Sequence, residues 1–204
     1  MNWINFFDAI YLINLPIRQD RLIEFTEEAE KYNIPFTLIN GITSKAGGAD
    51  GLLQTVKGIF ENSIEKNMQN ILIFEDDCLF LQDPNPIMNE VVKEIPEDYH
   101  ICFLGCQATT GFHYRQSVHL LQLDGAFSTH AAFYSRQAIK EILIRNFYAP
   151  IDNFYAAEIQ KMQKCYAVNP ILATQREGQS NIYDGIINWR PFIEQRFNQK
   201  LADL

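Results

Sequence analysis

The stretch ILIFEDDCLFL, residues 71–81, interrupts an apolar run with three consecutive acids. Successive side chains of a β-strand point to opposite faces, so Glu75 and Asp77 are predicted to share one side and Asp76 to face the other. Like charges close together near a core are costly unless they share a proton or meet a cation. The pattern therefore predicts a buried strand ending in a divalent-metal site. Glu75, Asp76 and Asp77 are the candidate ligands, and Mg²⁺ or Mn²⁺ suits their oxygens best.

A second interpretation is that the strand ends here and the three acids form a solvated turn. The apolar run resumes at once from Cys78 to Leu81, which favours a strand edge that lines a cleft. Ligands of open α/β sheets bind at the carboxyl ends of the strands, where these acids are expected. The metal site is the favoured interpretation, and the solvated turn stays open.

Strands and helices alternate on both sides of this stretch in the first half of the chain. Apolar, β-rich runs predict strands at 9–15, 35–39 and 71–74, and the spacing of apolar residues predicts helices at 18–32 and 52–66. Uninterrupted apolar strands that alternate with helices are typical of a parallel sheet covered on both faces. The predicted fold class is therefore α/β, a Rossmann-like layer fold with a mostly parallel central sheet flanked by helices.

The second half is less regular, and the glycine-bearing stretch 41–51 in the first half is predicted to be a loop. The elements predicted after residue 100 are strands at 100–105 and 118–123, a turn at Asp124-Gly125, and helices at 136–146, 152–164 and 187–204. No repeat or linker divides the 204 residues, so we expect a single domain, 1–204.

Composition excludes some classes of partner and site. Lys+Arg 17 against Asp+Glu 25 gives a net charge of −8, so no general field attracts nucleic acid. The four cysteines form no C-x-x-C pair, which favours buried thiols in a reducing compartment. The apolar residues 1–15 lack a basic leader and are too short to span a bilayer. We expect a cytoplasmic protein without a transmembrane segment, at most peripheral to a membrane.

Two arginines, Arg18 and Arg21, lie one helical turn apart at the predicted start of the helix 18–32. The helix dipole disfavours cations at this end, so the pair indicates an anion in front of it, and guanidinium groups suit phosphate. The alternative is a pair of surface arginines balanced by Asp20 and Glu24. Both interpretations stay open on the residues alone.

Five segments, taken in order, resemble glycosyltransferase family 25, the lipopolysaccharide and collagen galactosyltransferase group. They are YLINLPIRQDR (11–21), GLLQTVKGIF (51–60) leading to ILIFEDD (71–77), THAAFYSRQAIKEIL (129–143), PIDNFYAAEI (150–159) and PILATQREGQSNI (170–182). The chain departs from the family pattern at Gln54-Thr55, where a serine-histidine pair is usual, and at Asn181, where aspartate is usual. These departures concern specificity and catalytic competence.

The resemblance implies a GT-A-like fold, a nucleotide-sugar donor such as a UDP-hexose, dependence on Mn²⁺ or Mg²⁺, and an inverting transfer. It assigns 1–105 as the nucleotide-binding half and 106–204 as the acceptor-binding half with a C-terminal helix. The residues expected to bind the donor are Asn14, Arg18, Arg21, Asp76, Gln175 and Ser180.

Inverting transfer needs a carboxylate that accepts the proton of the attacking hydroxyl, and the family pattern favours Asp152. An N-cap of the helix 152–164 is the structural alternative for this aspartate. His130 is a second catalytic candidate, although a buried histidine among small and apolar residues is the commoner situation. Phe112, Tyr114 and Phe127 could stack a sugar, but core packing explains them equally.

The sequence thus predicts a metal-dependent inverting glycosyltransferase that moves a hexose, such as galactose, from a UDP-sugar to a hydroxyl of a glycan, lipooligosaccharide or protein. One alternative is a catalytically degenerate glycosyltransferase-like module that binds a sugar nucleotide or a partner. Another is a metal-dependent phosphohydrolase, since clustered acids and divalent ions also serve phosphoryl chemistry.

Overall fold

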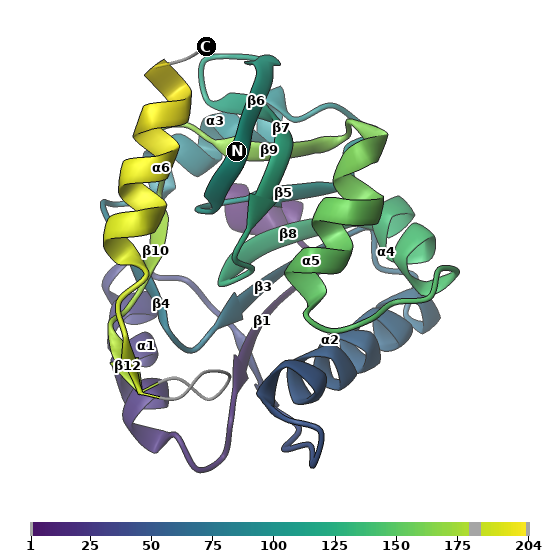
Figure 1. Cartoon of the computed structure of the whole chain (residues 1–204), viewed down its shortest axis with the longest axis vertical. Helices are drawn as coiled ribbons and strands as arrows, with labels where there is room; N and C mark the ends of the chain where they lie inside the picture. The colour runs from purple at the N-terminus through teal and green to yellow at the C-terminus, as the bar shows by residue number, and fades with distance from the viewer. Residues whose placement is uncertain (1, 180–184, 203–204) are drawn as a thin grey trace.

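A computed structural model describes residues 2–179 and 185–202, and its centre is an eight-stranded sheet with helices on both faces (Figure 1). In spatial order the strands are β2 (Thr37–Asn40), β1 (Ala9–Asn14), β3 (Asn70–Glu75), β8 (Ala131–Ser135), β5 (Ile101–Phe103), β9 (Cys165–Val168), β7 (Leu120–Phe127) and β6 (Gln107–Arg115). The pairings make β7 and β8 antiparallel to their neighbours, so the other six strands run in one direction. The predicted α/β class with a mostly parallel sheet is confirmed.

Helices cover both faces because the strands are apolar on both sides. The helical elements are η1 (Trp3–Phe6), α1 (Gln19–Lys31), α2 (Gly48–Glu65), α3 (Asn85–Glu94), α4 (Arg136–Leu143), α5 (Ile151–Phe154), the π-helical η2 (Tyr155–Ile159), η3 (Gln160–Met162) and α6 (Arg190–Ala202). In β3, Ile71 and Ile73 pack into the core under α2, α4 and α5, while Leu72 and Phe74 pack into the core under α1 and α3. This doubly buried strand carries the acidic triplet at its carboxyl end.

Two small sheets lie beside the main one. β4 (Cys78–Phe80) pairs antiparallel with β10 (Ala173–Gln175), and β11 (Gly178–Gln179) pairs with β12 (Ile186–Ile187). The apolar run after the triplet is thus a strand, as expected from its resumption at Cys78. β10 in turn brings the segment around Gln175 back to the triplet.

Several sequence expectations need correction. Asp124-Gly125 is not a turn, because both residues lie inside β7, where Gly125 leaves space that Thr110 Oγ1 occupies. The elements that were not predicted are the helix α3 and the strands β6, β8, β9, β10, β11 and β12. The assignment of 1–105 to nucleotide binding and 106–204 to acceptor binding stays a prediction. The two halves share one sheet, because β8 of the second half lies between β3 and β5 of the first.

All four cysteines are free and buried, as the sequence suggested. Within residues 2–179 and 185–202, none of the helices combines the length and the apolar character needed to cross a bilayer.

Candidate functional site

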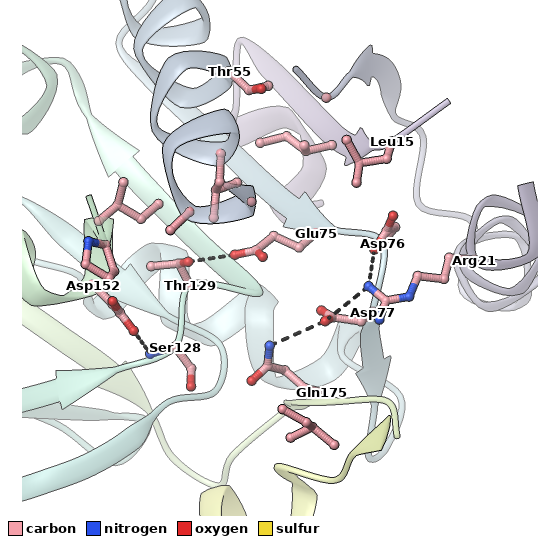
Figure 2. A pocket seen from close by; sticks show the side chains of 18 of the residues that line it. Leu15, Arg21, Thr55, Glu75, Asp76, Asp77, Ser128, Thr129, Asp152 and Gln175 are labelled. Carbon is pink, nitrogen blue, oxygen red and sulfur yellow. Dashed lines mark hydrogen bonds and ion pairs between the residues drawn. The ribbon is translucent and has the colours of Figure 1, made fainter. Parts of the chain in front are cut away.

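A cavity of about 640 Å³ opens where β1 and β3 end. The acidic triplet forms its centre, the segment from Gly41 to Thr55 forms one wall, and the β7–β8 connection with Asp152 forms another (Figure 2). This is the position at which open α/β sheets bind ligands, because the loops after the strands diverge there. The sequence placed the triplet at this edge, and the structure confirms that position.

Glu75 is the last residue of β3, and two contacts fix its position. Its backbone N–H donates to the carbonyl oxygen of His130 at 2.9 Å, which continues the β3–β8 pairing. Its side chain accepts a hydrogen bond from Thr129 Oγ1 at 2.6 Å, seen in Figure 2. Glu75 is therefore held by the β7–β8 connection rather than left free at a strand end.

Asp76 turns away from Glu75 toward α1. Its Oδ1 accepts a hydrogen bond from Arg21 at 2.8 Å, and the two side chains are only 9% and 11% exposed. The same guanidinium nitrogen lies 3.5 Å from Asp77 Oδ2. Arg21 therefore neutralises part of the charge of the triplet, and the alternation expected along the strand holds for Asp76.

Asp77 faces the cavity with Glu75. Its Oδ2 lies 3.5 Å from Gln175 Nε2, while its Oδ1 is buried and has no hydrogen-bond partner in the part of the chain that the structure describes. Burial raises the pKa of Asp77 to about 6, although the positive charge of Arg21 acts to lower it. Burial, followed by the charge of Asp77, raises the pKa of Glu75 to about 8. Arg21 compensates part of the charge of Asp77, while Glu75 has no cation in contact within residues 2–179 and 185–202.

The residues fit a divalent ion that is shared with a ligand. Among the described residues, no group of three or more Asp, Glu, His or Cys side chains is arranged to hold a metal. Asp76 is engaged by Arg21, which leaves Asp77, with its unpartnered oxygen, and Glu75 as the available ligands. Mg²⁺ is commonly held by one or two carboxylates together with phosphate oxygens, so this donor set suits a metal–diphosphate complex rather than a protein-only cage.

Asp152 lies across the cavity from Arg21, on the first turn of α5 (Figure 2). Its Oδ1 accepts the backbone N–H of Asn153 at 2.9 Å, and its Oδ2 lies 3.5 Å from the backbone nitrogen of Ser128. The alternative N-cap role is not seen, because Pro150 occupies the cap position. The carboxylate is therefore oriented by backbone groups and lines the cavity.

Two of the expected donor-binding residues, Asn14 and Arg18, are not in the cavity wall. Asn14 is buried beneath it and donates to the carbonyl of Leu15 at 2.9 Å. Arg18 pairs with Asp20 and donates to the carbonyl of Gln179 at 3.1 Å. Arg21 and Gln175 do line the cavity, and Ser180 lies outside the described residues.

His130 is fully buried and does not line the cavity. Neither ring nitrogen has a hydrogen-bond partner within the described residues, and burial lowers its pKa to about 4. Burial agrees with the structural interpretation of His130, and a catalytic role for it stays a prediction. Of the three aromatic residues suggested to stack a sugar, Phe127 lines the cavity and Phe112 and Tyr114 do not. The Phe112 ring instead packs against Phe197 of α6, with the ring centroids 5.1 Å apart.

The sequence analysis did not identify two threonines whose hydroxyl groups hold the two walls of the cavity in place. Thr129 bonds Glu75, and Thr55 of α2 bonds the backbone of the segment after β2. Thr55 was noted only as a departure from a family pattern, and Thr129 only within the segment 129–143. Thr129 lies two residues before β8, a strand that the sequence pattern did not reveal, so no signal in the sequence identified it.

No protein-family model matches the chain, and no curated protein matches it in sequence. Among solved structures, the fold resembles the protein A197 from STIV at 14% identity and TM-score 0.53, over 88% of this chain and 96% of that one. It resembles a glycosyltransferase involved in glycosylation of the major capsid of PBCV-1 at 13% identity and TM-score 0.52, over 79% and 81%.

A mutant Drosophila beta-1,4-galactosyltransferase 7, solved with manganese, UDP-Gal and xylobiose, aligns at 11% identity and TM-score 0.50 over 88% of this chain and 71% of that one. Identities this low establish shared architecture rather than shared activity. The chain has the GT-A-like fold of glycosyltransferases.

Proposed function

We propose that the protein is a metal-dependent inverting glycosyltransferase that moves a hexose from a UDP-sugar to a hydroxyl of a glycan or protein acceptor. The observation that carries the proposal is the cavity at the ends of β1 and β3, where Glu75 and Asp77 lie opposite Asp152 (Figure 2). Function resides in such a site rather than in the fold. The ordered motifs shared with family 25 support the finer assignment, and galactose is the hexose to test first.

Asp152 is proposed as the general base. As the acceptor oxygen attacks the anomeric carbon, the carboxylate takes the hydroxyl proton, and the bond from that carbon to the UDP oxygen breaks on the opposite face. One displacement of this kind inverts the anomeric configuration. The contacts with the backbone of Ser128 and Asn153 hold the carboxylate toward the cavity.

Asp77 and Glu75 would hold the divalent ion, which when bound would offset the charge that develops on the leaving diphosphate. Arg21 supplies a fixed positive charge at the same end of the cavity, through its contacts with Asp76 and Asp77. Preorganised charge of this kind stabilises the leaving group without reorganisation during the reaction.

The test is release of UDP from a panel of UDP-hexoses with Mn²⁺ and sugar acceptors. Asp77→Asn, which keeps the size of the side chain but removes its charge, should lower UDP release about 100-fold or more. Glu61→Gln is the matched control, because Glu61 is 60% exposed on α2 and should retain wild-type activity. Undiminished release by Asp77→Asn would refute the metal-holding role.

The panel also separates the alternatives. A degenerate module would bind UDP-sugars without releasing UDP from any of them. A phosphohydrolase would release inorganic phosphate rather than intact UDP. Either result would replace the glycosyltransferase proposal.

A further inference from the structure

One wall of the cavity presents uncharged residues to the cavity, and a buried hydroxyl helps to hold the segment that forms it. The cavity-facing residues of this wall include Gly41, Ile42, Thr43, Ser44, Gly47 and Gly48, none of which carries a charge. Figure 2 shows Thr55 on this side of the cavity, away from Arg21 and Asp152. The wall therefore differs in chemistry from the charged centre of the site.

Thr55 uses both hydrogen-bonding capacities of its hydroxyl on this wall. It accepts the backbone N–H of Ile42 at 2.9 Å and donates to the carbonyl of Gly51 at 2.8 Å. Thr55 is 4% exposed, so an apolar replacement would take this partner from the Ile42 N–H in a dry environment, whereas the Gly51 carbonyl lies within α2, where the backbone N–H of residue 55 can serve it. The hydroxyl thus ties the loop after β2 to the first turns of α2.

The loop after β2 also packs closely against the first turn of α2. A Cβ atom on Gly51 would lie 2.1 Å from the carbonyl oxygen of Ile42, which leaves no space for any side chain. At the outer end of the segment, Asp50 accepts hydrogen bonds from Ser44 at 2.5 Å and from Gln54 at 2.6 Å. The segment is therefore fixed at its inner and its outer end by residues of α2.

We propose that Thr55 is a positioning residue that holds the segment from Gly41 to Gly51 as the wall for the nucleoside portion of the donor, and so sets nucleotide affinity. The ligand assignment rests on the proposed function, whereas the positioning of the segment does not. A diphosphate belongs beside Arg21 and the divalent ion that Asp77 would hold, where positive charge offsets that of the phosphates, so the uncharged lining of this wall is left for the uncharged part of the donor. Gln54-Thr55, which departs from the family pattern, thereby acquires a role in this chain.

The experiment compares Thr55→Val, which removes the hydroxyl at constant shape, with Thr55→Ser, which retains it. Thr55→Val should weaken UDP binding about tenfold in calorimetry with Mn²⁺, while inorganic pyrophosphate binds as to the wild type. Thr55→Ser should restore UDP affinity. In turnover, Thr55→Val should raise the donor KM about tenfold and leave kcat within about twofold.

A fold defect would weaken UDP and pyrophosphate together, so parallel losses for both ligands would overturn the proposal, as would unchanged UDP affinity in Thr55→Val. Hydrogen exchange of the Ile42 amide checks the positioning without any ligand, and it should accelerate in Thr55→Val but not in Thr55→Ser. If wild-type protein binds pyrophosphate but no nucleotide, the proposed function fails, and the exchange data still decide whether Thr55 holds the segment.

Discussion

Glu75 combines burial with an uncompensated charge, and this has a consequence for stability. Its pKa rises on folding from 4.5 to about 8, so the folded chain binds this proton more tightly than the unfolded chain. Stability is then fully present at low pH and falls as pH rises from about 4.5 to about 8. With a chelator present to remove metal ions, the Tm of the wild type should fall between pH 4.5 and about pH 8. The Tm of Glu75→Gln should fall less, because its amide cannot ionise.

Thermal melts at closely spaced pH values, with Glu61→Gln as the exposed control, measure the difference. Equal slopes for wild type and Glu75→Gln would show that Glu75 does not carry the raised pKa.

Asp152 allows a kinetic prediction. Asp152→Asn keeps the side-chain shape but cannot accept a proton, so kcat should fall about 10²–10⁴-fold while UDP affinity stays unchanged. Asp98→Asn is the control, since Asp98 is 63% exposed and pairs with Lys164. Calorimetry and initial rates make the comparison, and a kcat within about twofold of wild type would remove Asp152 from the mechanism.

Individual residues differ in how well sequence located them. Arg21 lies in the first turn of α1 and reaches Asp76 at the cavity, whereas Arg18 is the N-cap residue and pairs with Asp20. Both arginines also donate to the carbonyl of Gln179. From their spacing alone the two arginines were expected to play the same role, because a sequence does not define the first residue of a helix to an accuracy of one residue. The position of His130 depended on β8, a strand that the pattern did not reveal.

At the level of secondary structure, two glycines that look equivalent in sequence should respond oppositely to alanine. A Cβ on Gly105, just after β5, would lie 1.8 Å from the carbonyl oxygen of Ala173, so Gly105→Ala must displace β10. Gly58 lies inside α2 with open space around it. Gly105→Ala should destabilise by roughly 1–3 kcal/mol, and Gly58→Ala should stabilise by about 0.5–1 kcal/mol.

Urea unfolding of the two variants measures both changes on one scale. A stable Gly105→Ala protein with wild-type midpoint would show that β5 and β10 do not approach as closely as described.

Elements with strong local periodicity were predictable, and elements defined by distant pairing were not. The apolar runs of β1 and β3 and the helical stripe of α2 identify those elements, because their burial follows directly from local pattern. The strand β8 is short, follows the buried His130 and gains its place only by pairing with β3 and β5. Such pairing depends on tertiary context that a local pattern does not contain.

For the molecule as a whole, the shared sheet predicts cooperative unfolding. β8 from the second half lies between β3 and β5 from the first, so neither half keeps its sheet when the other unfolds. The two tryptophans provide a test, because Trp3 is fully buried near the start of the chain and Trp189 precedes α6. In Trp189→Phe, the fluorescence of Trp3 and the far-UV circular dichroism should give coincident urea transitions.

Separated transitions would mean that the region around Trp3 unfolds independently of the rest. The site shares this organisation: Glu75 and Asp77 come from the first half, and Asp152 and Gln175 from the second. The sequence could predict that acids gather at one edge of the sheet. It could not predict that Asp152 and Gln175 face them, because that depends on how the whole sheet is assembled.

The four buried thiols give the chain an internal probe of its own opening. Cys78, Cys102, Cys106 and Cys165 lie in different strands or their ends and are shielded from reagents in solution. A thiol-modifying reagent can reach them only after the surrounding strands separate, so the alkylation rate reports how often the molecule opens. Mass-resolved labelling of the unaltered chain would then rank the regions of the sheet by the ease with which each comes apart.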